Sequence, residues 1–341
     1  MKKILAVLAI LMISTIGAHA SDWQFYGSAR VSTFMEKWDN GQFSSDDTTS
    51  FKEGLQTNSR IGAKVKVNDT LTGRFEYGST GKLRILYGEW NFGQGSLLVG
   101  QTYSPLNINY SNQVWWNDNG LRRVAGLYSG RNPMIRLKFG GVEIAAVEPQ
   151  TPYRPNKSTA EVKFPKLEAK YRVRGDNWDF QVAGGYNKYT LINGVAEYEI
   201  DSYFVGVGSR ITFKGFFLAA TAWGGINTGV YMIESLLFAT PEISFTTGDV
   251  NDTDCYGVTL VAGYTLNDSV TFEAGYGYSR ADIEASATPD AKLISMYVQS
   301  KITLAQGVYV VPEIGFLDME HYYGMDLGGV VYGGAKWQID F

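Results

Sequence analysis

The chain has 341 residues, a net charge of −4 at pH 7 and a single cysteine, Cys255. One cysteine excludes a disulfide framework, and we interpret this thiol as structural because no activating residue stands beside it. Beyond residue 20 no apolar run reaches the roughly 20 residues that a membrane helix needs. The 39 glycines, 22 tyrosines, 18 phenylalanines and 8 tryptophans are instead typical of strands that alternate between lipid-facing and lumen-facing residues.

Residues 1–20 have the three parts of a secretory signal peptide. Two lysines precede an apolar run over 4–16, and Ala18-His19-Ala20 is a small-x-small cleavage site. Cleavage before Ser21 leaves residues 21–341, which we expect to form one domain, because no linker or low-complexity tract interrupts them. Loss of the two lysines lowers the net charge from −4 to −6.

The rest of the chain divides into strand-like segments joined alternately by short turns and by long outer connections. Short turns such as Asn68-Asp69-Thr70 and Gly140-Gly141 contain turn-forming residues, and the outer connections include 39–54, 79–81, 103–132 and 228–253. This alternation is typical of a transmembrane antiparallel β-barrel. We predict an all-β barrel of sixteen strands; fourteen and eighteen are the alternative counts, because the pattern over 133–148 is weak. The expected strands cover 23–38, 55–67, 70–78, 82–93, 95–102, 133–139, 142–148, 160–174, 177–190, 198–213, 216–227, 254–266, 269–280, 292–304, 307–317 and 327–341.

Arginines on the early strands alternate with apolar residues. On 55–67, for example, Arg60 is followed by Ile61 on the opposite face. An arginine facing lipid at mid-membrane costs about 2–4 kcal/mol, so we assign the arginines to the lumen, an assignment that a one-residue slip in register would reverse. They could form a basic wall, or some could simply pair with lumen carboxylates such as Glu76 and Glu168. The set comprises Arg30, Arg60, Arg74, Arg84 and Arg136.

The last segment, 327–341, reads LGGVVYGGAKWQIDF. Its apolar residues, ending in Trp337, Ile339 and Phe341, share one face of a strand, and Lys336, Gln338 and Asp340 share the other. An edge strand of a soluble protein is the alternative, but a membrane strand between lipid and a wet lumen fits the pattern better. Aromatic residues near other strand ends, such as Trp23, Trp90 and Trp223, are expected in interfacial girdles.

Several motifs resemble those of the Gram-negative general diffusion porins. Tyr26-Gly27-Ser28-Ala29-Arg30 resembles the opening strand of that family and Asn58-Ser59-Arg60-Ile61-Gly62 its second-strand motif. The stretches 87–93 and 97–105 resemble the strands that lead into the constriction loop, and the terminal strand ending in Phe completes the resemblance. The middle of the chain resembles the family only in its alternation of strand-like segments and connections.

This resemblance implies a homotrimer of sixteen-stranded barrels in the outer membrane, in contact with its lipid and lipopolysaccharide. It also implies a third loop folded into the lumen, and a C-terminal strand, marked by Trp337, Ile339 and Phe341, that the barrel assembly machinery recognises. The function it implies is passive diffusion of small hydrophilic solutes and ions.

The third loop, 103–132, departs from the acid-rich pattern of the family. Asp118 is its only acid, whereas Arg122, Arg123 and Arg131 are basic. We expect Asp118 at or near the constriction and, because positive charge dominates there, a weak preference for anions. Trp115 and Trp116 are adjacent; we interpret them as packing the loop against the wall, with a sugar-stacking platform as the alternative.

Signals for other functions are weak. His321 is the only histidine after the signal, which leaves little for a Ser-His or Asp-His enzyme, and we expect no cofactor and no nucleic-acid partner. A lumen plug would need an additional N-terminal domain or a helix, for which there is no room before the first strand. A substrate-specific channel for sugars, phosphate or dicarboxylates on the same barrel is the second possibility.

Acidic residues in two outer loops carry the oxygen ligands that Ca²⁺ prefers. Their spacing matches no complete calcium site, so we interpret them as solvated loop acids, with loop-bound Ca²⁺ as the alternative. They are Asp46, Asp47, Asp249, Asp252 and Asp254.

Overall fold

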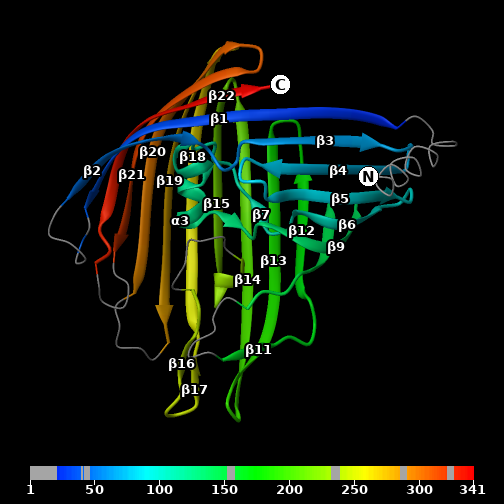
Figure 1. Ribbon diagram of the computed structural model, residues 1–341, viewed down its shortest axis with the longest axis vertical. Coiled ribbons are helices and arrows are strands. Elements are labelled where there is room, and N and C mark those ends of the chain that lie inside the picture. The colour runs from blue at the N-terminus through cyan, green and yellow to red at the C-terminus, as the bar shows by residue number, and fades with distance from the viewer. Residues whose placement is uncertain are drawn as a thin grey trace, which may run out of the picture.

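The computed structural model describes residues 21–39, 41, 47–151, 158–231, 239–284, 290–320 and 326–341 (Figure 1). The predicted signal peptide, Asp46 and His321 lie outside these residues. Across the described ranges no helix is long and apolar enough to cross a membrane.

Eighteen strand segments form one antiparallel sheet. Two barrel strands are interrupted, because β2 and β3 both pair with β1, and β11 and β12 both pair with β13. The last strand, β22, pairs with both β21 and β1, which closes the sheet. The described strands therefore form a closed sixteen-stranded barrel, and the predicted fold class and strand count are confirmed. The segments are β1 (Asp22–Asp39), β2 (Thr48–Leu55), β3 (Arg60–Lys66), β4 (Leu71–Gly78), β5 (Leu83–Asn91), β6 (Ser96–Tyr103), β9 (Arg131–Phe139), β10 (Val142–Val147), β11 (Thr159–Glu161), β12 (Lys166–Arg174), β13 (Trp178–Asn193), β14 (Ala196–Phe213), β15 (Phe216–Ile226), β18 (Thr253–Asn267), β19 (Val270–Ile283), β20 (Ala291–Ala305), β21 (Val308–Glu320) and β22 (Gly329–Asp340).

The remaining elements are short and lie in the connections. Between β6 and β9 they are β7 (Asn107–Ile108), α2 (Trp115–Asp118), α3 (Gly120–Ala125) and β8 (Leu127–Tyr128). Between β15 and β18 they are η3 (Thr228–Tyr231), β16 (Glu242–Ser244) and β17 (Asp249–Asn251).

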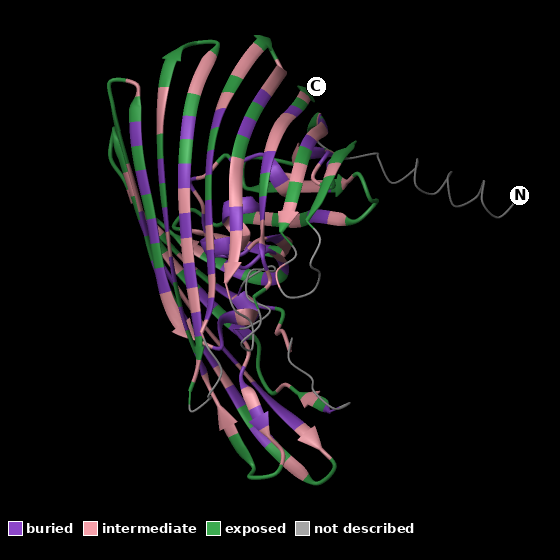
Figure 2. Ribbon diagram, turned by 90° about the vertical axis from the view of Figure 1, so that its left-hand side faces the viewer, coloured by how far each residue is buried: buried purple, intermediate pink, exposed green. Residues whose placement is uncertain are grey.

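Along the long strands, residues alternate between an exposed face and a buried face, as the banding in Figure 2 shows. On β14, Tyr203, Val205 and Val207 are exposed, whereas Phe204 and Gly206 between them are buried. An apolar exposed face with this period of two is what a barrel surrounded by lipid requires.

The wall is uneven in height. The barrel strands β3, β4, β5, β6, β9 and β10 contain six to nine residues each, whereas β13 and β14 contain 16 and 18. The short strands gather on one side of the barrel in Figure 1 and the long green to orange strands on the other. The strands over 133–148, which the sequence pattern marked only weakly, belong to the short side.

Two expectations about the early strands need correction. The predicted strand 55–67 begins only at Arg60 as β3, and β2 covers Thr48–Leu55, mostly within the expected connection 39–54. Between the two, Gln56 donates to the carbonyl of Val114 at 3.0 Å. The connection 79–81 is a tight turn, not a long loop: the Gly81 amide bonds to Gly78 and Gly81 has a φ of 73°, which glycine adopts without steric cost.

Candidate pore-lining site

Residues 104–130, here called the β6–β9 segment, pack against the buried face of the barrel strands. The main buried apolar cluster joins Leu106, Val114 and Leu121 of this segment to Phe204 and Tyr332 of β14 and β22. The two termini of the segment continue into adjacent paired strands, β6 and β9. The segment is therefore held at both ends by the wall and along its length by apolar contacts.

Three buried carboxylates on the barrel strands accept backbone N–H groups from the β6–β9 segment. Glu168 on β12 accepts from Leu106 at 3.2 Å, and Glu273 on β19 accepts from Asn112 at 2.7 Å. Glu313 on β21 accepts from Val114 at 2.6 Å and, more weakly, from Trp115 at 3.4 Å. Buried irregular backbone needs such partners, because an unpaired buried N–H is costly.

Trp115 is fully buried and fixes the middle of the segment to the wall. Its ring stacks on Tyr332 with centroids 4.0 Å apart and 8° between the planes, and its Nε1 donates to Glu36 at 3.0 Å. Trp116 instead lies under the guanidinium of Arg123, 3.8 Å from the ring centroid. These contacts agree with the packing interpretation, because Trp115 leaves no free face for a sugar ring.

A sharp left-handed turn follows and directs Asp118 toward the wall. Trp116, Asn117 and Asp118 have φ values of 55°, 61° and 64°, a region that costs free energy for residues with a side chain. The Asp118 carboxylate pairs with Arg30 at 2.6 Å and with Lys336 at 3.1 Å. The strained backbone thus places the only acid of the segment between two cations from β1 and β22.

Three of the predicted arginines converge on one carboxylate. Glu76 is completely buried; Arg84 pairs with it at 2.6 Å, Arg74 at 3.0 Å and Arg60 at 3.9 Å. Tyr26 donates to the same carboxylate at 2.9 Å. The cluster carries a net charge of about +2 from these four ionised groups.

The other arginines lie apart from this cluster. Arg136 pairs with Glu143 at 3.0 Å, and Lys170 shares that carboxylate at 3.3 Å. Arg122 lies 4.5 Å over the Tyr128 ring and Arg131 lies 5.3 Å over the Tyr103 ring. Within the described part of the chain neither Arg122 nor Arg131 pairs with a carboxylate. The expected wall is therefore three separate groups. Of the two carboxylates named in the alternative interpretation, Glu76 pairs with arginines, whereas Glu168 pairs with Lys166 at 3.0 Å.

Comparison with solved structures finds outer-membrane proteins. The outer membrane channel DcaP of Acinetobacter baumannii matches with a TM-score of 0.74 at 17% identity, over 94% of this chain and 97% of that one. The anion-selective porin from Comamonas acidovorans matches with a TM-score of 0.62 at 12% identity, over 94% and 100%. OmpF of Salmonella typhi gives 0.61 at 13% identity, over 93% and 97%. The chain has the porin fold. No protein-family model and no curated sequence matches, so the similarity is one of fold.

Two polar cavities flank the β6–β9 segment within this porin fold. One, of about 460 Å³, is lined by Arg30, Asp118, Arg122 and Lys336 together with Glu273. The other, of about 480 Å³, contains Tyr110, Asp179 and Arg210. Tyr110 donates to Asp179 at 2.9 Å, and burial raises the pKa of Tyr110 to about 12, so this phenol stays protonated in neutral solution. Both cavities can hold water and small polar solutes.

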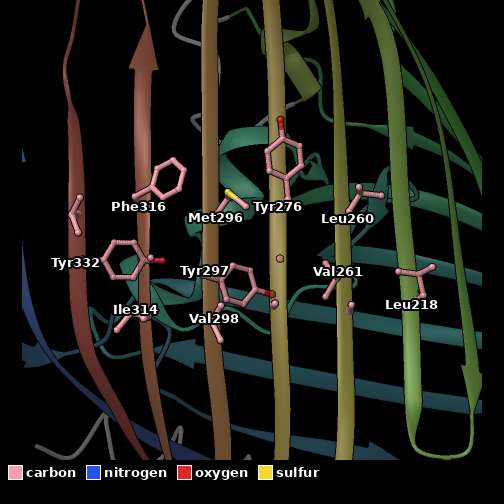
Figure 3. A pocket seen from close by; sticks show the side chains of 15 residues that line it. Leu218, Leu260, Val261, Tyr276, Met296, Tyr297, Val298, Ile314, Phe316 and Tyr332 are labelled. Atoms are coloured by element: carbon pink, nitrogen blue, oxygen red, sulfur yellow. The ribbon is translucent and has the colours of Figure 1, made fainter.

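A third hollow belongs to the outside of the porin wall. It has a volume of about 590 Å³ and lies across β15 and β18 to β22 (Figure 3). Leu218, Leu260, Val298 and Ile314, which line it, are exposed apolar residues. Such a surface fits lipid chains and not a hydrophilic solute.

Several residues of the site escaped the sequence analysis. The alternation of residues along the strands marks three of them as facing inward: Glu273, Glu313 and Lys336. Nothing in their local sequence indicates contact with the β6–β9 segment. Trp223 was expected in a girdle; this was wrong, because it is buried and its Nε1 donates to the Ala125 carbonyl at 2.8 Å. By contrast, Trp23, Trp90, Trp337, Ile339 and Phe341 are all exposed.

The outer-loop acids show no metal-binding arrangement. Asp47 pairs with Lys37 at 3.1 Å, and Asp252 accepts from Asn227 at 2.7 Å. No group of three or more His, Cys, Asp or Glu residues that could hold a metal occurs among the residues described.

Proposed function

We propose that the chain is an outer-membrane porin through which small hydrophilic solutes and ions diffuse passively, with a weak preference for anions. The observation that carries the proposal is the concentration of arginines on the buried face of a closed barrel, where Arg60, Arg74 and Arg84 share the single carboxylate of Glu76. A channel selects ions by the charges along its narrow wet passage. Excess positive charge there favours anions.

Several acidic residues are engaged by the protein itself or lie far from the arginines, which weakens their opposition to this preference. Glu168, Glu273 and Glu313 have their oxygens occupied by N–H groups of the β6–β9 segment, which we propose is the constriction loop. Other acids lie toward the barrel rims, such as Asp39 and Glu320 at the ends of β1 and β21. Salt screens charges beyond about 8–10 Å, so acids at the rim act weakly on an ion in the constriction.

The proposal includes the setting of the channel. Residues 1–20 would direct secretion, the exposed apolar face would contact outer-membrane lipid and lipopolysaccharide, and three copies would form a homotrimer. The exposed Trp337, Ile339 and Phe341 would be recognised by the barrel assembly machinery. No catalytic role is proposed, because the site contains charge pairs and no nucleophile with an adjacent base.

The test is the zero-current potential of purified, refolded protein in a planar bilayer under a salt gradient, with single-channel steps recorded. We expect a mild anion preference and steps that arrive in groups of three. An Arg60→Gln/Arg84→Gln double variant should shift the potential toward cation preference, whereas Lys66→Gln, in the pair with Asp69 outside the cluster, should not. A clear cation preference of the wild type would overturn the proposed selectivity, and absence of conductance would overturn the channel.

A substrate-specific channel on the same barrel is the second candidate. The polar cavities on both sides of the β6–β9 segment favour it, since a discrete cavity binds a solute more strongly than a uniform pore. Saturation of the current by one class of solute would distinguish it from general diffusion. Trp115 gives no support for a sugar platform, because Tyr332 already covers its ring.

A further inference from the structure

A separate cavity of about 530 Å³ lies where β1, β3, β4 and β6 meet, toward the end of the barrel at which β1 begins. It lies beside the Glu76 cluster and differs from the two cavities that flank the β6–β9 segment. Its charged side chains are Arg60, Lys64, Arg74 and Asp340, and its other polar lining comes from Gln24, Tyr26, Ser28, Tyr103 and the terminal residue Phe341.

The three cationic side chains of this cavity, Arg60, Lys64 and Arg74, differ in how many hydrogen bonds and ion pairs they already make. Arg74 is fixed, since its Nε donates to the Tyr26 hydroxyl at 2.9 Å and its Nη2 to Glu76 at 3.0 Å. The Arg60 guanidinium lies 3.9 Å from the Glu76 carboxylate, which is too far for a hydrogen bond. Lys64 is exposed, and within the described residues its ammonium has no ion pair. Two of the three cations therefore retain hydrogen-bond donors for a ligand.

The arrangement of like charges is unfavourable as it stands. Lys64 and Arg74 are direct partners across the β3–β4 pair, and like charges at that position destabilise a sheet. Arg60 precedes Lys64 by four residues and lies on the same face of β3. With Arg84 and Glu76 of the adjacent cluster included, four cations face the carboxylates of Glu76 and Asp340 and the terminal carboxylate of Phe341, which leaves an excess of one positive charge.

We propose that this cavity is a saturable binding site for small dianions whose oxygen atoms accept hydrogen bonds from Arg60, Lys64 and Arg74. A dianion would more than offset the excess positive charge and relieve the repulsion between Lys64 and Arg74. Guanidinium groups match the geometry of carboxylate and tetrahedral oxyanions. The inference rests on the proposed function, because it names the solute class that an anion-preferring channel would favour. Exposure of Lys64 keeps binding weak enough for release, as conduction requires.

The experiment compares sulfate with perchlorate, a tetrahedral oxyanion of similar shape that carries one charge. Chloride current through single channels is recorded while each anion is added, and calorimetry of the folded protein in detergent measures sulfate binding without conduction. We expect sulfate to reduce the current saturably, with a half-blocking concentration at least tenfold below that of perchlorate. Succinate tests whether carboxylates serve equally: a block by both dianions identifies charge as the feature recognised, and a block by sulfate alone identifies a tetrahedral oxyanion site.

Variants locate the site. Lys64→Gln, which breaks no ion pair of the described residues, should weaken sulfate binding at least fivefold, and Arg60→Gln should weaken it similarly. Lys66→Gln, two residues along the same strand and paired with Asp69 at 2.7 Å, should leave it unchanged. Equal binding of sulfate and perchlorate, or equal weakening by all three variants, would overturn the proposal. Anion preference without a sulfate site would overturn this inference alone, whereas sulfate binding in a protein that does not conduct would overturn only the channel function.

Discussion

The attachment of the β6–β9 segment to Glu313 can be tested by removing the carboxylate. In the wild type, Glu313 accepts a hydrogen bond from the backbone N–H of Val114 at 2.6 Å and from the Tyr332 hydroxyl at 2.9 Å. Both donors lose this acceptor in Glu313→Ala. Gln113 holds Tyr332 from the other side at 2.6 Å. The substitution therefore removes the point at which β21 holds two consecutive residues of the segment, Val114 and Trp115.

The magnitude follows from the two donors left unpaired. Each buried donor without a partner costs about 1–3 kcal/mol, so the segment loses about 2–6 kcal/mol of attachment. Even the lower value changes the ratio of attached to detached segment by about 30-fold. Glu313→Gln keeps a carbonyl acceptor of nearly the same shape and should lose about 1 kcal/mol, because only the charge assistance disappears.

Two measurements report detachment. If the segment narrows the pore, Glu313→Ala should increase single-channel conductance and current noise, with Glu313→Gln between it and the wild type. Trypsin should also cleave after Arg122 faster in the alanine variant. Glu320→Ala, at the far end of the same strand and 3.9 Å from Lys292, serves as the control. Wild-type conductance and trypsin resistance in a correctly folded Glu313→Ala variant would refute the reasoning.

Three further predictions concern the charge pairs and the closing strand. Asp118→Asn removes the acid that pairs with Arg30 and should shift the zero-current potential further toward anion preference; an unchanged potential would place Asp118 outside the ion path. Glu76→Gln leaves three arginines without their shared carboxylate, which should lower the unfolding free energy in urea by about 3 kcal/mol. Retained stability would mean that solvent already screens the cluster. Gly27→Val should reduce the yield of folded barrel on unheated gels, because a Cβ there would overlap the Phe341 ring; Phe341→Ala in the same chain should restore part of it.

The strands were predictable because each carries its own signal. The alternation of exposed and buried residues on β14 repeats for most of its 18 residues, and turn-forming residues mark its ends. A period of two and a turn are local properties, so neither depends on what lies across the barrel. The inward orientation of the arginines was predictable from the same alternation, because the opposite orientation would place a charge in lipid.

The contacts of the β6–β9 segment were not predictable for the opposite reason. Whether Glu313 accepts an N–H from Val114 depends on the path of a segment almost 200 residues earlier in the chain. The break at residues 56–59 also depends on that path, because Gln56 bonds to Val114. Trp223 looks like a girdle residue until Ala125 is placed beside it. Local pattern identifies the face of a residue and not its partner.

The pairing of β1 with β22 has a consequence for how quickly this chain can fold. Thr33 donates to the carbonyl of Ala335 at 3.3 Å, although 302 residues separate them, and twelve consecutive residue pairs join the same two strands. Contacts at such separation require the ends of a very long loop to meet before any hydrogen bond forms. Until they meet, both strands expose unpaired edges that can pair with another chain. We therefore expect closure of the barrel to be slow and late, and the open intermediate to be the species that aggregates.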